Sequence, residues 1–139
     1  MRVGVIGAGQ LARMMIPAAV NLGVELAVLA EAEGMSADLA AVGVGDYRNT
    51  EEVLAFAKTV DVVTFDHEHV PQSVLAAVEA SGTPVRPGPH ALAFAQDKIE
   101  MRRRLSELRM PVPDWAAVSD AAGLGEFLEM GADMGLQNL

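Results

Sequence analysis

The chain has 139 residues, about half of them apolar and a fifth charged, which suits one compact globular domain. The formal charge is −9 with only ten Lys and Arg, so a nucleic-acid partner is not expected. Cysteine is absent, and so are a signal peptide and any apolar run near the roughly 20 residues of a membrane span. These absences exclude disulfides and thiolate metal sites, and we expect a cytoplasmic protein without a membrane partner.

Short apolar strands alternate with helical patterns through the first part of the chain. Gly23 is placed to end the first helix, and Asn49 or Thr50 is placed to cap the second. In chain order we expect strand 2–6, helix 10–22, strand 24–29, short strand 42–44, helix 50–58, strand 60–65, helix 71–80 and brief strand 84–85.

The remaining chain is richer in proline and in charge. We expect a rigid turn at 86–89, helices at 90–95 and 97–108, a linker at 110–113, a strand at 115–118 and a helix at 121–130. The sequence therefore predicts a domain over 1–109, followed at 110–139 by a linker and the start of another region.

This alternation predicts an α/β fold, a Rossmann-like doubly wound parallel sheet with helices on both faces. Ligands of such sheets bind at the carboxyl ends of the strands. The most polar strand ends are Gly7-Ala8-Gly9-Gln10 and Asp66-His67-Glu68-His69, and we expect them at the same edge.

The first of these segments matches the pattern G-x-G-x-x-A through Gly7, Gly9 and Ala12. Glycines permit a tight turn and a close approach of the backbone to a phosphate. Glu31 follows the second strand, roughly where an acidic residue would bind a ribose, so a nicotinamide dinucleotide is one interpretation. The other interpretation is that these glycines are needed only for packing.

The second segment holds four consecutive ionisable residues after a buried strand. In an extended chain Asp66 and Glu68 would point to one side, with His67 and His69 on the other. Two neighbouring carboxylates are suited to a cationic or hydroxylated ligand, and we expect Asp66 and Glu68 to serve binding rather than stability. A solvated loop before a helix is the alternative, and one short cluster supplies too few ligands to predict a metal site.

Lys98 lies near the start of a predicted helix, where a positive charge is unfavourable for the helix dipole. This position indicates either a role toward an anionic ligand or an ordinary surface lysine.

Five segments occur in an order that resembles the amino-terminal part of the N5-carboxyaminoimidazole ribonucleotide synthase family, within the ATP-grasp superfamily, and actinobacterial members in particular. They are GAGQLARM, VTFDHEHVP, VRPGPHAL, AQDKIEMRRRL and PVPDW, and the resemblance covers residues 1 to about 118. It implies a pre-ATP-grasp domain of an enzyme that joins 5-aminoimidazole ribonucleotide, bicarbonate and ATP in purine biosynthesis.

The resemblance also implies roles for individual residues. Gly9, Gln10 and Leu11 would contact 5-aminoimidazole ribonucleotide, with the acidic pair Asp66 and Glu68 close to it. Lys98 would contact ATP. No catalytic residue and no metal ligand carries over to this chain.

After the linker the family continues into a glycine-rich ATP-binding domain with Mg²⁺ carboxylates, which this sequence does not show, and the tail from about Met134 does not resemble the family. We therefore expect the chain alone to be inactive and to bind ATP weakly, and a homodimer for the full-length family. A fragment of a nicotinamide-dependent oxidoreductase and a non-catalytic module that pairs with another chain are the alternatives.

Overall fold

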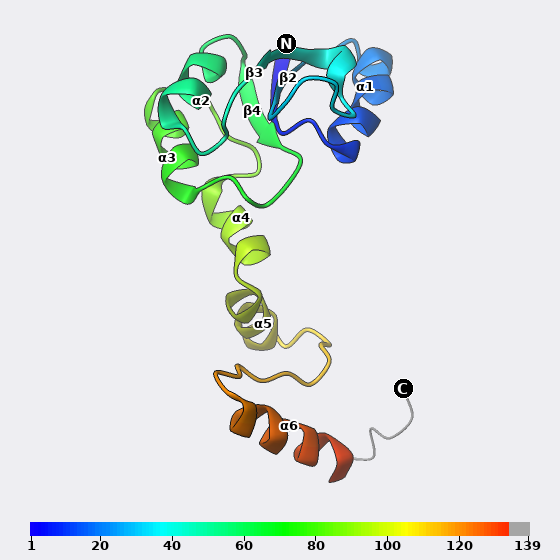
Figure 1. The fold of residues 1–139 in the computed structure, drawn as a ribbon, viewed down its shortest axis with the longest axis vertical. Helices are drawn as coiled ribbons and strands as arrows, with labels where there is room; N and C mark the ends of the chain where they lie inside the picture. The colour runs from blue at the N-terminus through cyan, green and yellow to red at the C-terminus, as the bar shows by residue number, and fades with distance from the viewer. Residues whose placement is uncertain (134–139) are drawn as a thin grey trace. The chain divides into compact units, whose positions relative to one another are not determined.

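The computed structural model describes residues 1–133 and forms two compact units (Figure 1). The first unit, Met1–Asp97, holds the sheet; the second begins at Lys98 and contains helices α5 (Lys98–Glu107) and α6 (Ala121–Asp133). The contacts within the chain place α5 in the second unit, which begins at Lys98. The domain predicted from the sequence instead ends at residue 109. That functional division stays a prediction, and the unusual tail from Met134 lies outside the described residues.

The first unit is built on four parallel strands in the order β3-β2-β1-β4. Each strand is short and rich in small aliphatic residues, as expected for strands covered on both faces. Their bounds are β1 Arg2–Ile6, β2 Glu25–Ala30, β3 Ala41–Val44 and β4 Val62–Phe65. The strands predicted at these four places are confirmed, with boundaries that differ by at most two residues.

Helices cover both faces of the sheet. On β1, the neighbours Val5 and Ile6 point into different cores, because successive strand residues face opposite sides. Val5 packs against Ala12 of α1, and Ile6 shares its core with side chains of the other helices. These elements are α1 Gln10–Leu22, α2 Thr50–Ala57, α3 Gln72–Ala80, α4 Pro89–Gln96 and the 3₁₀ helix η1 Asp38–Ala40. The doubly wound α/β fold is confirmed.

The helix ends follow the expected local chemistry. Gly23 adopts a left-handed conformation with φ 65° just after α1. Asn49 caps α2, because its side-chain Oδ1 accepts hydrogen bonds from the N–H groups of Glu51 (3.0 Å) and Glu52 (3.4 Å).

Two predicted strands differ from the structure. The brief strand at 84–85 is a single parallel bridge between Val85 and Val63. The strand expected at 115–118 is wrong: these residues have no regular structure, because no neighbouring strand in the described part of the second unit offers them hydrogen bonds. Within residues 1–133, no helix has both the length and the apolarity to cross a bilayer.

The strand order places a topological switch point between β1 and β4. The chain leaves β1 toward β2 on one side and reaches β4 on the other side only after β3 and α2. In open α/β sheets the crevice at such a point, outside the carboxyl ends of the strands, is where ligands bind. Residues following Ile6 and Phe65 lie there.

Candidate functional site

The turn after β1 requires glycine at Gly7. Its φ is +101°, a conformation that side chains rarely adopt, and its N–H donates to the carbonyl oxygen of Leu29 at 3.0 Å. A Cβ at this position would collide with Oδ1 of Asp66 and lie 2.9 Å from Cδ2 of His67. The glycine thus lets the segment after β4 pack directly on the turn.

The next two N–H groups of the turn donate hydrogen bonds to carboxylates that follow two other strands. Ala8 donates to Oε2 of Glu31 at 3.1 Å, and Gly9 donates to Oδ2 of Asp66 at 2.7 Å. The Asp66 side chain is only 3% exposed. These contacts confirm that the glycine segment and the Asp66–His69 segment meet at one edge of the sheet.

Helix α1 begins at this turn with open backbone donors. In the described part of the chain, the N–H groups of Gln10, Leu11 and Ala12 have no protein acceptor, since Gly9 offers no capping side chain. The first turn of α1 also contains no acidic residue. Open N–H groups and the positive end of the helix dipole together favour an anion such as a phosphate.

The Asp66–His69 segment does not have the predicted alternation. It forms a bend and turn directly after β4 ends at Phe65, so the two-residue period of a strand does not apply. The side chain of Asp66 is buried under the glycine turn, whereas Glu68 is exposed and its carbonyl oxygen accepts a 2.8 Å hydrogen bond from Nε2 of Gln96. The Asp66 carboxylate accepts a hydrogen bond from the turn, and the expectation that Asp66 serves substrate binding stays a prediction.

Sequence reasoning missed one pairing at this edge. Nε2 of His67 lies 3.2 Å from Oε1 of Glu31, which is 36 residues away in the chain. The His67 ring also packs edge-on against Tyr47, with 4.8 Å between ring centroids. In the nicotinamide interpretation Glu31 would bind a ribose, but both of its carboxylate oxygens contact this chain. No sequence spacing signals such a contact between separate strand ends.

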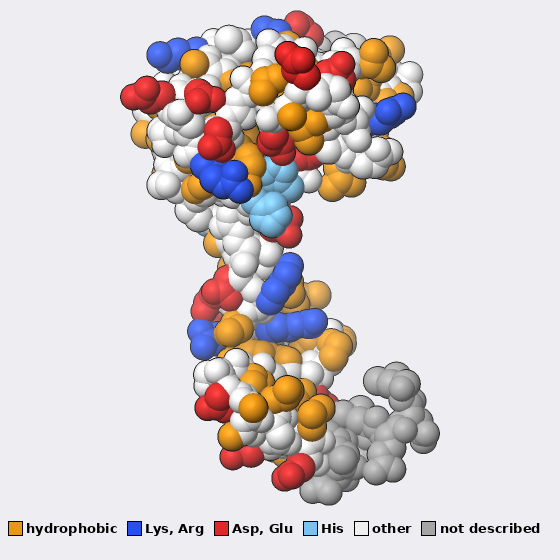
Figure 2. All heavy atoms as spheres, in the orientation of Figure 1, with side chains coloured by type: hydrophobic (Ala, Val, Ile, Leu, Met, Phe, Trp, Pro, Cys, Tyr) orange, Lys and Arg blue, Asp and Glu red, His pale blue; other side chains and the backbone are white. Residues whose placement is uncertain are grey.

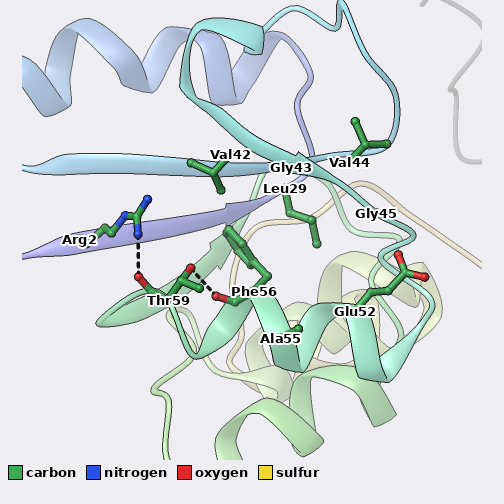
Figure 3. A pocket seen from close by; sticks show the side chains of 10 residues that line it. All are labelled: Arg2, Leu29, Val42, Gly43, Val44, Gly45, Glu52, Ala55, Phe56 and Thr59. Carbon is green, nitrogen blue, oxygen red and sulfur yellow. Dashed lines mark hydrogen bonds between the residues drawn. The ribbon is translucent and has the colours of Figure 1, made fainter.

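A separate cavity of about 480 Å³ lies between β3 and α2 (Figure 3). Leu29 and Phe56 form its apolar floor, and Nη1 of Arg2 donates to the carbonyl oxygen of Thr59 at 3.0 Å at one end. None of the site residues predicted from the sequence lines it.

A second hollow, of about 580 Å³, lies at the ends of β2 and β3. It is lined by Glu31, Tyr47 and Arg48, with Arg48 stacked over the Tyr47 ring at 4.2 Å. This hollow borders the glycine turn through Glu31, which bonds to Ala8.

The remaining predicted site residue, Lys98, is the first residue of α5 and is exposed in the second unit. Its role toward ATP stays a prediction. Across residues 1–133 no group of three or more His, Asp and Glu side chains is placed to hold a metal ion.

A parallel sheet with helices on both faces and a glycine turn at its switch point defines the class of Rossmann-like α/β domains. Residues 1–96 match a family model described as the ribonucleotide synthetase preATP-grasp domain. The chain belongs to this family.

The relatives found by sequence are longer than this chain. The chain is 46% identical over 127 residues to N5-carboxyaminoimidazole ribonucleotide synthase of Corynebacterium ammoniagenes, covering 90% of this chain and 31% of the relative. It is 42% identical over 126 residues to the protein of the same name from Mycobacterium leprae, covering 89% and 29%. The chain thus spans about a third of the length of these relatives.

A solved structure with bound ligands has the same fold. It is N5-carboxyaminoimidazole synthase from Aspergillus clavatus in complex with ADP and 5-aminoimidazole ribonucleotide. The TM-score is 0.78 at 30% sequence identity, and the match covers 96% of this chain and 36% of that chain.

Proposed function

We propose that this chain is the amino-terminal, substrate-binding part of an ATP-dependent ligase that carboxylates 5-aminoimidazole ribonucleotide with bicarbonate in purine biosynthesis. The observation that carries the proposal is the set of open N–H groups on Gln10, Leu11 and Ala12 at the switch point of the sheet. They are suited to the phosphate of a ribonucleotide. The similarity to N5-carboxyaminoimidazole ribonucleotide synthases suggests which ribonucleotide it is.

The predicted substrate contacts fit this site in different ways. Gly9 leaves room for the Asp66 carboxylate, since a Cβ there would lie 2.7 Å from its Oδ2, and Gln10 and Leu11 present the backbone of the first turn of α1 to the ligand. Glu68 is exposed at the same edge and is suited to a hydroxyl or amino group of the substrate. Asp66 supports the turn from the side of the sheet end, since its carboxylate accepts the hydrogen bond from the N–H of Gly9.

ATP binding by this chain alone is expected to be weak. Lys98 is the one predicted ATP contact, and a single exposed charge pair contributes about 0–1 kcal/mol. Millimolar affinity already needs about 4 kcal/mol. Mg²⁺ normally reaches a protein through substrate phosphates and one or two carboxylates, and the resemblance places these carboxylates in the region that follows this part of the family. The 139-residue chain by itself is therefore expected to lack ligase activity.

The environment of Glu31 weighs against the nicotinamide interpretation. A dinucleotide site needs its acidic residue for the ribose and its turn N–H groups for the pyrophosphate. Here Glu31 accepts from Ala8 and meets His67, and the N–H of Gly9 is bonded to Asp66. The family match points to a mononucleotide as well.

The proposal also includes a cytoplasmic location and, for the longer relatives, a homodimer.

Titration calorimetry of the 139-residue chain tests this proposal. 5-Aminoimidazole ribonucleotide, ATP with Mg²⁺, and NADH are titrated separately into the same preparation. Binding of the aminoimidazole ribonucleotide with higher affinity than either other ligand is the expected result. Tight magnesium-dependent ATP binding, ATP turnover with bicarbonate, or preferential NADH binding would contradict the proposal.

A further inference from the structure

His67 lies among groups from three different strand ends. Its Nε2 is 3.2 Å from Oε1 of Glu31 after β2, and its ring packs on Tyr47 after β3. The His67 side chain is 19% exposed. Figure 2 shows histidine side chains gathered beside acidic ones on the first unit. The imidazole therefore connects the loops that surround the glycine turn.

The hydrogen bonds of His67 define its tautomer. The N–H of His69 donates to Nδ1 of His67 at 3.2 Å, so Nδ1 carries a lone pair and no proton. The proton of the neutral ring is then on Nε2, where it is donated to Glu31.

A second carboxylate faces the same imidazole nitrogen. Oδ1 of Asp66 is buried and has no hydrogen-bond partner in the described part of the chain, and it lies 4.0 Å from Nε2 of His67. The N–H of His67 thus points at one carboxylate and lies close to another. Without the imidazole, Oε1 of Glu31 would lose this donor, and the two carboxylates would keep only their hydrogen bonds from the N–H groups of Ala8 and Gly9.

We propose that His67 is a positioning residue for the anion-binding turn. Nε2–H of His67 orients Glu31, and Glu31 in turn holds the N–H of Ala8. The fixed turn sets the direction in which the open N–H groups at the start of α1 face the ligand phosphate. This inference rests on the proposed function, because it assigns His67 a role in binding the same ribonucleotide without touching it.

The first test compares matched substitutions in one segment. His67→Phe keeps a flat ring against Tyr47 and removes both hydrogen bonds. His69→Phe makes the same substitution at an exposed neighbour, whose ring centroid lies 5.5 Å from that of His67. His67→Gln restores a donor toward Glu31. We expect His67→Phe to weaken binding of 5-aminoimidazole ribonucleotide about fivefold to tenfold, the worth of roughly one hydrogen bond. His69→Phe should stay near the unsubstituted chain, and His67→Gln should recover part of the loss.

A double-mutant cycle separates positioning from general structural damage. If His67 acts through Glu31, then Glu31→Ala weakens binding once and His67→Phe adds little in that background. Fully additive losses, or equal affinities of the His67→Phe and unsubstituted chains, would overturn the proposal.

Nuclear magnetic resonance without ligand keeps this test independent of the proposed function. The ¹⁵N shifts of the His67 ring should report the Nε2–H tautomer, and His67→Phe should move the amide signals of Ala8 and Gly9. If the unsubstituted chain binds no aminoimidazole ribonucleotide, the proposed function fails while these spectra still decide the arrangement of the turn. An Nδ1–H tautomer, or unmoved Ala8 and Gly9 signals, would overturn the positioning role.

Discussion

The N–H of Gly9 donates a 2.7 Å hydrogen bond to Oδ2 of Asp66, a residue 57 positions later in the chain. This bond ties the turn after β1 to the end of β4 across the switch point of the sheet. Because the Asp66 side chain is almost completely buried, the bond is shielded from water, and its loss would leave a backbone donor poorly satisfied.

Replacing Asp66 is expected to lower stability. Asp66→Ala should reduce the free energy of unfolding by about 1.5–3 kcal/mol, the usual cost of losing a hydrogen bond to a buried charged group. Glu68→Ala is the matched control, since this exposed carboxylate two residues away should change stability by no more than about 0.5 kcal/mol. Urea denaturation measures both, and equal effects of the two substitutions would refute the structural role of Asp66.

Gly7 is expected to be irreplaceable for a steric reason in addition to its backbone conformation. Gly82 has a similar φ of +95° with open space around it, so Gly82→Ala reports the conformational cost alone, about 1–2 kcal/mol. Gly7→Ala adds a collision with Asp66 and should cost about 1–3 kcal/mol more. Thermal or urea unfolding of both variants checks this difference. Similar losses would show that the loop carrying Asp66 moves away freely.

Much of the fold follows from local patterns in the sequence. The β-branched run before Gly7 predicted β1, and Gly23 and Asn49 marked helix ends through backbone chemistry that acts within a few residues. The strand expected around Trp115 failed because a strand also needs a partner, which a local pattern does not report.

The meeting of the two polar segments was predictable from the sequence, whereas their individual contacts were not. Polar residues after two apolar strands of one parallel sheet must meet at the same edge, and Gly9 and Asp66 do. The burial of Asp66 depends on the missing side chain of Gly7, and the Glu31–His67 pair depends on how three loops pack. Neither relation has a period or spacing in the sequence.

The open donors of α1 can be tested by removing one of them without disturbing the helix. Gln10 is the first residue of α1, a position where proline is favourable because its missing N–H has no partner within a helix. Gly9 precedes it with φ −75° and ψ −166°, the extended conformation that a residue before proline requires. Gln10→Pro should therefore leave the free energy of unfolding nearly unchanged.

Binding should respond differently in the same variant. If the N–H of Gln10 donates to a ligand phosphate, Gln10→Pro should weaken binding of 5-aminoimidazole ribonucleotide about tenfold or more, since hydrogen bonds to charged groups are worth about 1.5–3 kcal/mol. Gln10→Ala keeps the N–H and removes only the side chain, so the ratio of the two affinities isolates the backbone donor. Calorimetry on both variants measures this ratio. Equal affinities for Gln10→Pro and Gln10→Ala, with both proteins folded, would place the phosphate away from the start of α1.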